Sequence, residues 1–322
     1  MKINVLGATG QLGRKVVQSL LDQGASAGDL MATVRNPGKA EDLEDLGVTV
    51  RKGDYEDPTS LRIALQGTEI LMLVPTTAPV EPRIQQHFNA VEAAKECGVR
   101  RILFASLSTA GFLDSKFLIT PFLLYAESKL RLSGMDWTIL RNNLYLDPIA
   151  DWIPELVEMK RLPYPVKQGR VAYVSRDDLA RASAAACLNS GHSNQVYELS
   201  GPDALSMEEL AITISRVTGR SVRFDSVTEE EFAEVCRQGT EDVPDFFIEI
   251  LTSLYRAVDN KEFKAVTNHV ERITGTRSET VESYLRGSLP RVYTKLRSKK
   301  YSTGEGPSLK IPPNPPFSKG GT

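Results

Sequence analysis

The sequence predicts a doubly wound α/β fold, in which a parallel Rossmann-type sheet carries a smaller C-terminal α/β lobe and a disordered tail. Two observations support this prediction. Through the first half of the 322-residue chain, short β-rich runs alternate with helical segments. This order requires right-handed crossovers and a sheet covered on both faces. A glycine-rich stretch, GATGQLG, also joins the first β-rich run to the first helix.

The strands of this sheet can be assigned in chain order. The first, INVL, precedes the glycine-rich stretch, and the last, MDWTILR, follows a helix expected over about residues 121–133. With this strand the nucleotide-binding core is complete, so we expect an NAD(P)-binding Rossmann domain over residues 1–145. The expected strands are residues 3–7, 30–35, 48–54, 69–75, 100–106 and 135–141.

Residues 146–290 are expected to form a substrate-binding lobe that is interleaved with the core. The strand candidates VAYVS, VYELSG and SVRFDSV are isolated here among helices such as SRDDLARASAAACLN and SMEELAITISRVTG. Ser206 and Glu209 have the spacing of a capping box at the start of the last of these helices. Open α/β proteins bind ligands at the carboxyl edge of the sheet, so we expect the lobe to supply a substrate pocket there.

The final residues, 291–322, are expected to be a disordered tail. The segment is basic, rich in proline and glycine, and ends IPPNPPFSKGGT. Such a composition buries too little apolar surface to offset the entropy of ordering the chain. A basic tail can contact an anionic partner or remain a solvated terminus, and we favour the solvated terminus.

Composition argues against several classes of protein. The formal net charge of −2 and an isoelectric point near 6.1 provide no overall field that attracts nucleic acid or an anionic membrane. The first apolar stretch is too short for a signal sequence, and no later run has the length of a membrane span. We therefore expect a cytoplasmic protein without membrane insertion.

The residue types that bind metals do not form a ligand pattern. Three cysteines lie far apart in the sequence, and the three histidines have no cysteine or carboxylate partner at ligand spacing. We expect neither a disulfide framework nor a metal site, and we assign no catalytic role to a histidine. These residues are Cys97, Cys187, Cys236, His87, His192 and His269.

The glycine-rich stretch is the strongest indication of a ligand. Gly7 permits a tight turn, Gly10 lets the backbone approach a pyrophosphate, and Gly13 allows close packing of helix on strand. The helix N-terminus then offers unpaired N–H groups to phosphates. The alternative is a glycine turn without a ligand, but the strand and helix on either side favour nucleotide binding. The candidate residues in this loop are Gly7, Thr9, Gly10, Gln11, Leu12 and Gly13.

The residue after the second strand indicates which dinucleotide is bound. NAD-binding folds place an acid there for the ribose hydroxyl, whereas this chain has Arg35. An arginine can bind the 2′-phosphate of NADP with two hydrogen bonds, so we predict NADP(H). The alternative is a surface arginine in a turn.

Further candidates follow the ends of the later strands, where they would meet the cofactor. Asp54 and Tyr55 follow the third strand and could border the adenine, although Asp54 is equally suited to capping the next helix. Ser106 and Asn142, at the ends of the fifth and sixth strands, could contact nicotinamide or substrate, or could instead satisfy backbone groups. The fourth strand brings Val74, Pro75 and Thr76 near the cofactor.

The stretch YAESK raises the question of a Tyr-x-x-x-Lys proton-transfer pair. Tyr125 and Lys129 share a helix face, and a nearby lysine can lower the pKa of a tyrosine. However, the helix must end near Ser133, so Lys129 would lie about 6 Å and Tyr125 about 12 Å above the lower edge of the sheet. The register that reaches the upper edge holds the apolar Leu123 and Leu124. We therefore predict that this pair is not the proton donor and leave the catalytic residues unassigned.

Taken together, GATGQLG, VRNP, GDYEDPTSL, VRRILFASL, SGMDWTILRN and VYELSGPDALSMEELA resemble the NmrA-like branch of the atypical short-chain dehydrogenases/reductases. The resemblance is strongest to the bacterial NAD(P)H:quinone oxidoreductases of that branch and covers residues 1 to about 290. It implies NADPH bound without flavin at Gly7, Gly10, Gly13 and Arg35. It also implies a flat electron acceptor, such as a quinone, in the cleft.

Two functions are consistent with these residues. The first is an NADPH-dependent quinone-type reductase. It needs no dedicated acid, because a reduced quinone is a phenolate-like base that solvent or a hydroxyl can protonate. Tyr145 and Trp152, just past the sixth strand, could wall a flat pocket, although aromatic side chains more often pack in a core. The second is a redox sensor that binds NADP(H) without turnover and regulates a partner protein.

Overall fold

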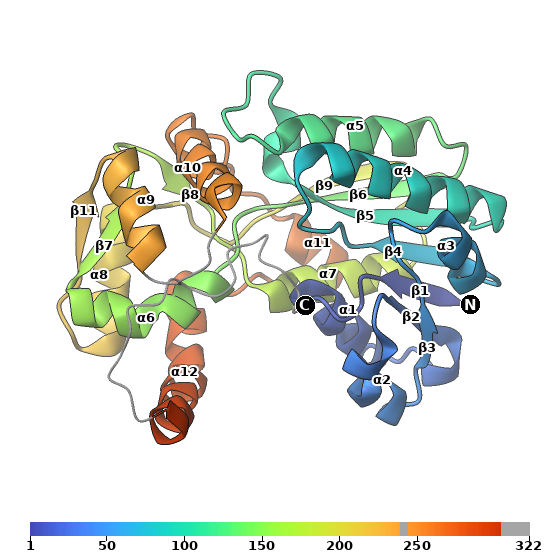
Figure 1. Cartoon of the computed structure of the whole chain (residues 1–322), viewed down its shortest axis with the longest axis horizontal. Coiled ribbons are helices and arrows are strands. Elements are labelled where there is room, and N and C mark those ends of the chain that lie inside the picture. Colours follow the sequence, from blue (N-terminus) through green and yellow to red (C-terminus); the bar gives the residue numbers. More distant parts are fainter. Residues whose placement is uncertain (239–243, 304–322) are drawn as a thin grey trace.

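Seven parallel strands form the main sheet of the computed structural model, which describes residues 1–238 and 244–303 (Figure 1). Their order is β3-β2-β1-β4-β5-β6-β9, so the chain winds outward in both directions from β1. This is the predicted doubly wound topology. The strands are β1 (Ile3–Leu6), β2 (Leu30–Val34), β3 (Thr49–Lys52), β4 (Ile70–Leu73), β5 (Arg101–Leu107), β6 (Asp136–Asn142) and β9 (Gln195–Leu199).

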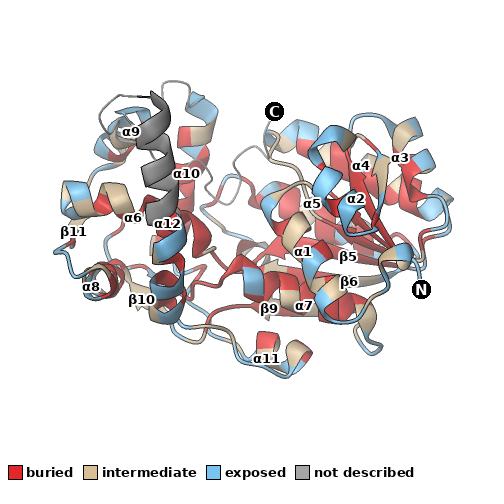
Figure 2. Cartoon of the chain, turned by 90° about the horizontal axis from the view of Figure 1, so that it is seen from below, coloured by how far each residue is buried: buried red, intermediate tan, exposed pale blue. Residues whose placement is uncertain are grey.

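Helices cover both faces of this sheet. The central strands β1, β4 and β5 are buried along their whole length, as expected for parallel strands with helices above and below (Figure 2). One face carries α3 (Pro58–Leu65), α4 (Val80–Glu96) and α5 (Thr120–Arg131). The other carries α1 (Gln11–Asp22), α2 (Glu41–Asp45), α7 (Arg176–Leu188) and α11 (His269–Thr274). Short 3₁₀ turns are η1 (Ala27–Asp29), η2 (Pro37–Lys39) and η3 (Ser108–Gly111).

Two segments that the sequence analysis grouped with the smaller lobe belong to the main sheet. VYELSG forms β9, which pairs in parallel with β6 from Thr138↔Gln195 to Asn142↔Leu199. SRDDLARASAAACLN forms α7, whose alanine-rich face packs against α1. Periodicity identified both elements correctly, but it could not show which sheet they join, because strand pairing is decided by tertiary contacts.

The free edge of β9 is closed by the chain that follows the smaller lobe. The N–H of Glu198 donates to Nδ1 of His269 at 2.9 Å, and the hydroxyl of Thr267 donates to the Glu198 carbonyl at 2.5 Å. These bonds occupy backbone groups that would otherwise be available to another strand.

The smaller lobe lies beside the carboxyl edge of the main sheet (Figure 1). It contains a parallel pair of strands, β7 with β11, and an antiparallel pair, β8 with β10. The predicted capping box is present: Ser206 Oγ accepts from the N–H of Glu209, and the Glu209 carboxylate accepts from the N–H of Ser206. Its elements are α6 (Asp147–Met159), β7 (Arg161–Tyr164), β8 (Arg170–Val171), β10 (Leu205–Ser206), α8 (Met207–Thr218), β11 (Arg223–Ser226), α9 (Glu229–Gln238), α10 (Asp245–Asp259) and α12 (Val281–Thr303).

The sequence analysis placed the start of the disordered tail too early, at residue 291. Helix α12 continues to Thr303, and within it Val292 is buried while Arg291 lies 3.6 Å from Asp151 of α6. The basic composition hid an apolar repeat that begins at Val281 and includes Leu285 and Val292. Residues 304–322, which hold the proline-rich end of the expected tail, lie outside the described residues.

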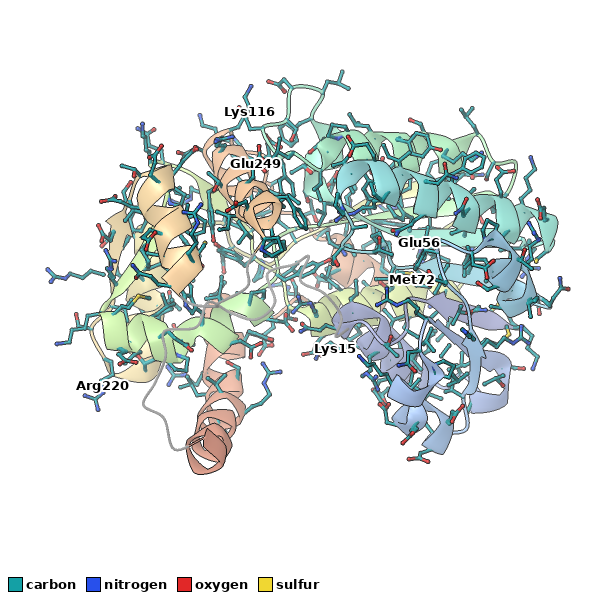
Figure 3. All side chains as sticks on the ribbon, in the orientation of Figure 1. Lys15, Glu56, Met72, Lys116, Arg220 and Glu249 are labelled. Carbon is teal, nitrogen blue, oxygen red and sulfur yellow. The ribbon has the colours of Figure 1, made fainter. Side chains whose placement is uncertain are left out.

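A buried carboxylate joins the loop after η3 to the smaller lobe. Glu262, 1% exposed, accepts from the N–H of Lys116 at 2.7 Å and from the hydroxyl of Ser115 at 2.5 Å. Figure 3 shows Lys116 beside α10, the helix that carries Glu249. A second tie follows β6, where the Asn143 amide donates to the Phe263 carbonyl at 3.0 Å. These contacts fix the smaller lobe against the ends of β5 and β6.

A buried ion pair joins helix α5 to strand β6 of the main sheet. The guanidinium of Arg141 donates to both oxygens of Glu127, at 2.9 and 2.8 Å, and to Glu198 at 3.0 Å. Glu127 also accepts from the Ser106 hydroxyl at 2.8 Å. Burial alone would lower the pKa of Arg141, but the two carboxylates raise it, so the guanidinium stays charged.

Two features are absent from the described part of the chain. None of the helices there is long and apolar enough to span a bilayer. Within residues 1–238 and 244–303, His, Cys, Asp and Glu side chains form no group of three that could hold a metal ion.

Removal of the Glu127 carboxylate should destabilise the fold, because it takes away the group that accepts two hydrogen bonds from the largely buried Arg141 guanidinium. We expect Glu127→Ala to lower the free energy of unfolding by about 3 kcal/mol in urea titrations. The control is Glu96→Ala, which breaks an exposed pair with Arg62 and should cost less than about 1 kcal/mol. Equal effects of the two substitutions would contradict the structural importance of the buried pair.

Candidate functional site

The carboxyl ends of the parallel strands face the smaller lobe, and the predicted phosphate loop lies on this edge (Figure 1). Gly7 has a φ of 87°, in the left-handed region that favours glycine. A Cβ on Gly13 would lie 2.2 Å from the Gly7 carbonyl oxygen, so a side chain cannot be accommodated without moving backbone. The loop therefore has the tight turn and the close helix packing that the sequence predicted.

The N-terminus of α1 is open to a ligand. Gly10 occupies the N-cap and provides no side-chain cap, so the first-turn N–H groups have no partner from the cap residue. Gln11 is exposed and Thr9 is half-buried, and both can reach a bound group. The Leu12 side chain is 6% exposed and packs in the core, which leaves only its N–H for a phosphate. This geometry suits an anion.

Arg35 directly follows β2 at the same edge. Its side chain is exposed and forms no hydrogen bond or ion pair with the described residues. Arg14 of α1, which sequence reasoning missed, approaches this loop by pairing with Asp42 and donating to the Lys39 carbonyl at 2.9 Å. The pairing with Arg14 neutralises Asp42, and the exposed Arg35 guanidinium is available to a phosphate.

Asp54 and Tyr55 lie beyond β3, but the structure gives them different tasks. The Tyr55 hydroxyl donates to the Val74 carbonyl at 2.6 Å, which ties the end of β4 to this loop. Burial raises the pKa of this phenol above its ordinary value. Asp54 accepts from the N–H of Glu56, whereas the N-cap of α3 is Asp57. The alternative that Asp54 caps α3 is therefore wrong.

The loop after β4 lies over the N-terminal part of α4. Val74, Pro75 and Thr76 are each half-buried at the sheet edge. The Thr76 hydroxyl donates to Gln86, and Gln86 in turn donates to Glu56 at 3.0 Å. This chain of hydrogen bonds fixes the loop that we expect to border a cofactor.

Ser106 and Asn142 differ in what their side chains can reach. Ser106 is fully buried, and its hydroxyl donates to Glu127 inside the protein. Asn142, 1% exposed, donates from Nδ2 to the Tyr145 hydroxyl at 3.2 Å, while its Oδ1 has no hydrogen-bond donor among the described residues. Sequence reasoning missed Thr109, whose buried hydroxyl likewise has no hydrogen-bond partner among the described residues. Its signal was the pair of hydroxyls in SLST directly after β5.

The YAESK stretch presents an unexpected residue to the sheet. Glu127 points inward and pairs with Arg141, while Lys129 binds Glu92 of α4 at 2.5 Å and lies 4.4 Å from the Phe88 ring centroid. Glu92 is four residues from the C-terminal end of α4, at the edge of the sheet opposite the phosphate loop. Tyr125, which lies on α5 one helical turn before Lys129, is half-buried. Glu127, between Tyr125 and Lys129, reaches Ser106 and Arg141 near the carboxyl ends of β5 and β6, so the exclusion of the pair as proton donor stays a prediction.

The smaller lobe contains an apolar pocket of about 630 Å³, part of which is open to solvent. Tyr145 and Trp152, the two aromatics predicted after the sixth strand, both line it. Trp152 is only 4% exposed, and its ring centroid lies 5.7 Å from that of Tyr164. It therefore packs in the hydrophobic core and also forms part of the pocket wall. The other lining residues are Leu144, Pro148, Ile149, Tyr164, Tyr173, Phe232, Val235, Cys236, Leu251, Leu254 and Tyr255.

Burial shifts the pKa of two side chains that could otherwise act as a nucleophile or transfer a proton. Burial raises the pKa of the Cys236 thiol in the pocket wall to about 12, so the reactive thiolate is absent at neutral pH. Burial lowers the pKa of His87 on α4 to about 3, which keeps that ring neutral. Neither residue is a candidate for catalysis.

The arrangement of these groups fits a dinucleotide. The glycine loop and the α1 N-terminus can hold a pyrophosphate, and Arg35 can hold a further phosphate on the adenosine side. At the other end, the orphaned Oδ1 of Asn142 is a buried acceptor that a carboxamide N–H could satisfy. The apolar pocket lies next to Asn142, through Tyr145.

Comparison with known proteins agrees with this geometry. A model of the NmrA-like family matches residues 1–306. Quinone oxidoreductase 2 of Escherichia coli (strain K12) is 36% identical over 236 residues, which cover 72% of this chain and 79% of the relative. The crystal structure of an E. coli NADPH-dependent quinone oxidoreductase complexed with NADPH superposes with a TM-score of 0.83 at 31% identity, covering 89% and 99% of the two chains. A Citrobacter triphenylmethane reductase complexed with NADP(H) gives 0.81 at 31% identity, with 89% and 100% covered.

Gly13→Ala should prevent dinucleotide binding, because the new Cβ would contact the Gly7 carbonyl and push α1 away from the loop. We expect the affinity for a reduced dinucleotide, measured by its fluorescence, to fall at least about tenfold. The control is Gly28→Ala, where the added Cβ would meet nothing closer than 3.9 Å. An unchanged affinity in Gly13→Ala would show that the phosphates do not lie on this turn.

Proposed function

We propose that this chain, which belongs to the NmrA-like family, is an NADPH-dependent reductase of flat, apolar electron acceptors of the quinone type, acting without flavin. The observation that carries the proposal is the position of the aromatic pocket. It adjoins the end of β6, where Asn142 offers an unsatisfied buried acceptor, on the same edge as the phosphate loop. The relatives named above, a quinone oxidoreductase and a triphenylmethane reductase, support both the cofactor and an acceptor of this shape.

The residues of the main domain would hold the cofactor along the sheet edge. Gly7, Gly10 and the first-turn N–H groups of α1 bind the pyrophosphate, and Arg35 selects the 2′-phosphate. Asp54, Tyr55, Val74, Pro75 and Thr76 border the adenosine half, and Asn142 binds the nicotinamide amide. Bound there, NADPH supplies a hydride.

The pocket residues would bind and orient the acceptor. Aromatic walls stack on a flat ring and exclude water, and orientation contributes a large part of the rate when the reacting atoms are held close. The fully buried Ser106 would support the site by holding Glu127, rather than by touching a ligand. We place this reductase in the cytoplasm, where NADPH is available.

Steady-state oxidation of NADPH with a panel of benzoquinones and naphthoquinones tests the proposal. We expect turnover that depends on the quinone and on no added flavin. Tight NADPH binding without turnover of any acceptor would instead favour the redox sensor, which binds the dinucleotide and regulates a partner.

Arg35→Ala should weaken NADPH binding far more than NADH binding. A hydrogen-bonded contact with the charged 2′-phosphate contributes about 1.5–3 kcal/mol, or roughly ten- to a hundredfold in affinity. Titration with both cofactors measures the difference. Arg220→Ala, at an exposed arginine of the smaller lobe, is the control and should change neither affinity (Figure 3). An equal loss for NADPH and NADH would remove Arg35 from this role.

Tyr125→Phe should leave quinone reduction nearly intact, because Lys129 is bound to Glu92 far from the phosphate loop. Removal of a true general acid costs about a hundredfold or more in rate. The measurement is kcat with a quinone under saturating NADPH. A hundredfold loss in this variant would restore the Tyr-Lys pair as the proton donor.

A further inference from the structure

Tyr145 lies where the carboxyl edge of the sheet meets the apolar pocket. Tyr145 is three residues after the end of β6, and its backbone forms a β-bridge with Val174. One part of the ring packs on the core cluster that also supports Val74 and contains Leu12 of the phosphate loop. The same side chain lines the pocket. It therefore contacts both the cofactor edge and the space proposed for the acceptor.

The hydroxyl of Tyr145 has a proton to donate. Its oxygen accepts a hydrogen bond from Asn142 Nδ2 at 3.2 Å, and no acceptor for its own proton is found among the described residues. Another tyrosine of the pocket, Tyr173, differs in this respect, because its hydroxyl donates to the sulfur of Met207 at 3.8 Å. The rings of Tyr164 and Tyr255 stack on each other, with their centroids 4.5 Å apart.

A buried cation lies against the same ring. The guanidinium carbon of Arg176 is 4.8 Å from the Tyr145 ring centroid, and Arg176 is 3% exposed. Asp147 lies beside it: one carboxylate oxygen is 3.6 Å from the guanidinium NH1 of Arg176, and the other accepts from the backbone N–H of Arg176 at 2.9 Å. Burial raises the pKa of Tyr145, while the Asn142 hydrogen bond and the Arg176 charge oppose that rise. The phenol is therefore protonated at neutral pH, and a cation is in place to stabilise the phenolate that proton donation leaves.

We propose that Tyr145 is the proton donor to the reduced acceptor, with Asn142 and Arg176 as its positioning residues. This inference rests on the proposed function. A quinone that has gained a hydride, and with it two electrons from NADPH, carries a negative charge on one oxygen. The O–H bond of Tyr145 breaks as an O–H bond forms on that oxygen, which gives the neutral hydroquinone. The tyrosinate then recovers its proton from water.

Two classes of acceptor separate proton donation from binding. A quinone needs a hydride and a proton, whereas a cationic triarylmethane dye becomes a neutral product on gaining a hydride alone. We expect Tyr145→Phe to lower kcat for quinones by about a hundredfold. Its kcat for the dye should stay within about threefold of wild type, which also shows that the variant folds and binds NADPH. Tyr125→Phe, a tyrosine outside the site, is the control and should change neither rate.

A second measurement uses no turnover. A coloured hydroxynaphthoquinone is added to the cofactor-free protein, and its ionisation is followed by absorbance as the pH is varied. A hydrogen bond from Tyr145 to the ligand oxyanion should lower the apparent pKa of the bound ligand by about one unit relative to Tyr145→Phe, which corresponds to tenfold in its ionisation constant.

The outcomes separate this inference from the proposed function. Equal losses of quinone and dye reduction in Tyr145→Phe, or no loss of either, would overturn Tyr145 as proton donor while the reductase stands. If wild type reduces no acceptor, the proposed function fails. The ligand titration then still decides whether Tyr145 donates to a bound oxyanion, and an unshifted pKa would count against it.

Discussion

The buried carboxylate of Glu127 is the constraint on which the arrangement of the site depends. It accepts hydrogen bonds from Arg141 of β6 and Ser106 of β5, and Arg141 extends the contact to Glu198 of β9. One side chain of α5 therefore fixes the spacing of three neighbouring strands at the edge where a ligand would bind. A charge so deeply buried is stable only with its partners in place, so α5 has little freedom to rotate or slide.

This constraint decides which residues are available for chemistry. Because Glu127 turns toward the sheet, Lys129 is directed to Glu92 of α4, and the familiar Tyr-Lys spacing becomes part of the helix packing. Polar groups without described partners remain at the ends of β5 and β6 instead, in Thr109 and Asn142. In the proposed mechanism, proton transfer therefore takes place at the border of the smaller lobe, where Tyr145 and Arg176 meet, and not on the α5 face of the sheet.

The sequence was informative where short-range chemistry decides the structure, and less so where distant residues do. Strand order, the glycine turn and the capping box follow from spacings of a few residues, and each was predictable. The membership of β9 in the main sheet depends on pairing with β6, and the length of α12 depends on packing against α6 and α8, so neither could be read from periodicity. The spacing of Tyr125 and Lys129 was visible in the sequence, but only the fold reveals that Glu127 between them faces Arg141. Likewise, Arg176 and Tyr145 are 31 residues apart in sequence, and no local pattern links them.

The division of the site between two lobes has a consequence for specificity. In the proposed mode of binding, the main domain selects its cofactor with directed polar groups, because Arg35 gains a charge-assisted contact only from a cofactor that carries the matching phosphate. The smaller lobe offers mostly apolar and aromatic walls, and the Tyr173 hydroxyl there is already hydrogen-bonded within the protein. An apolar pocket distinguishes ligands by size and shape, and discriminates only weakly between molecules of similar outline. Under the proposed function, the chain would therefore be selective for its electron donor and tolerant of its acceptor, while the hydrogen bonds at Glu262 and Asn143 hold the two parts in register.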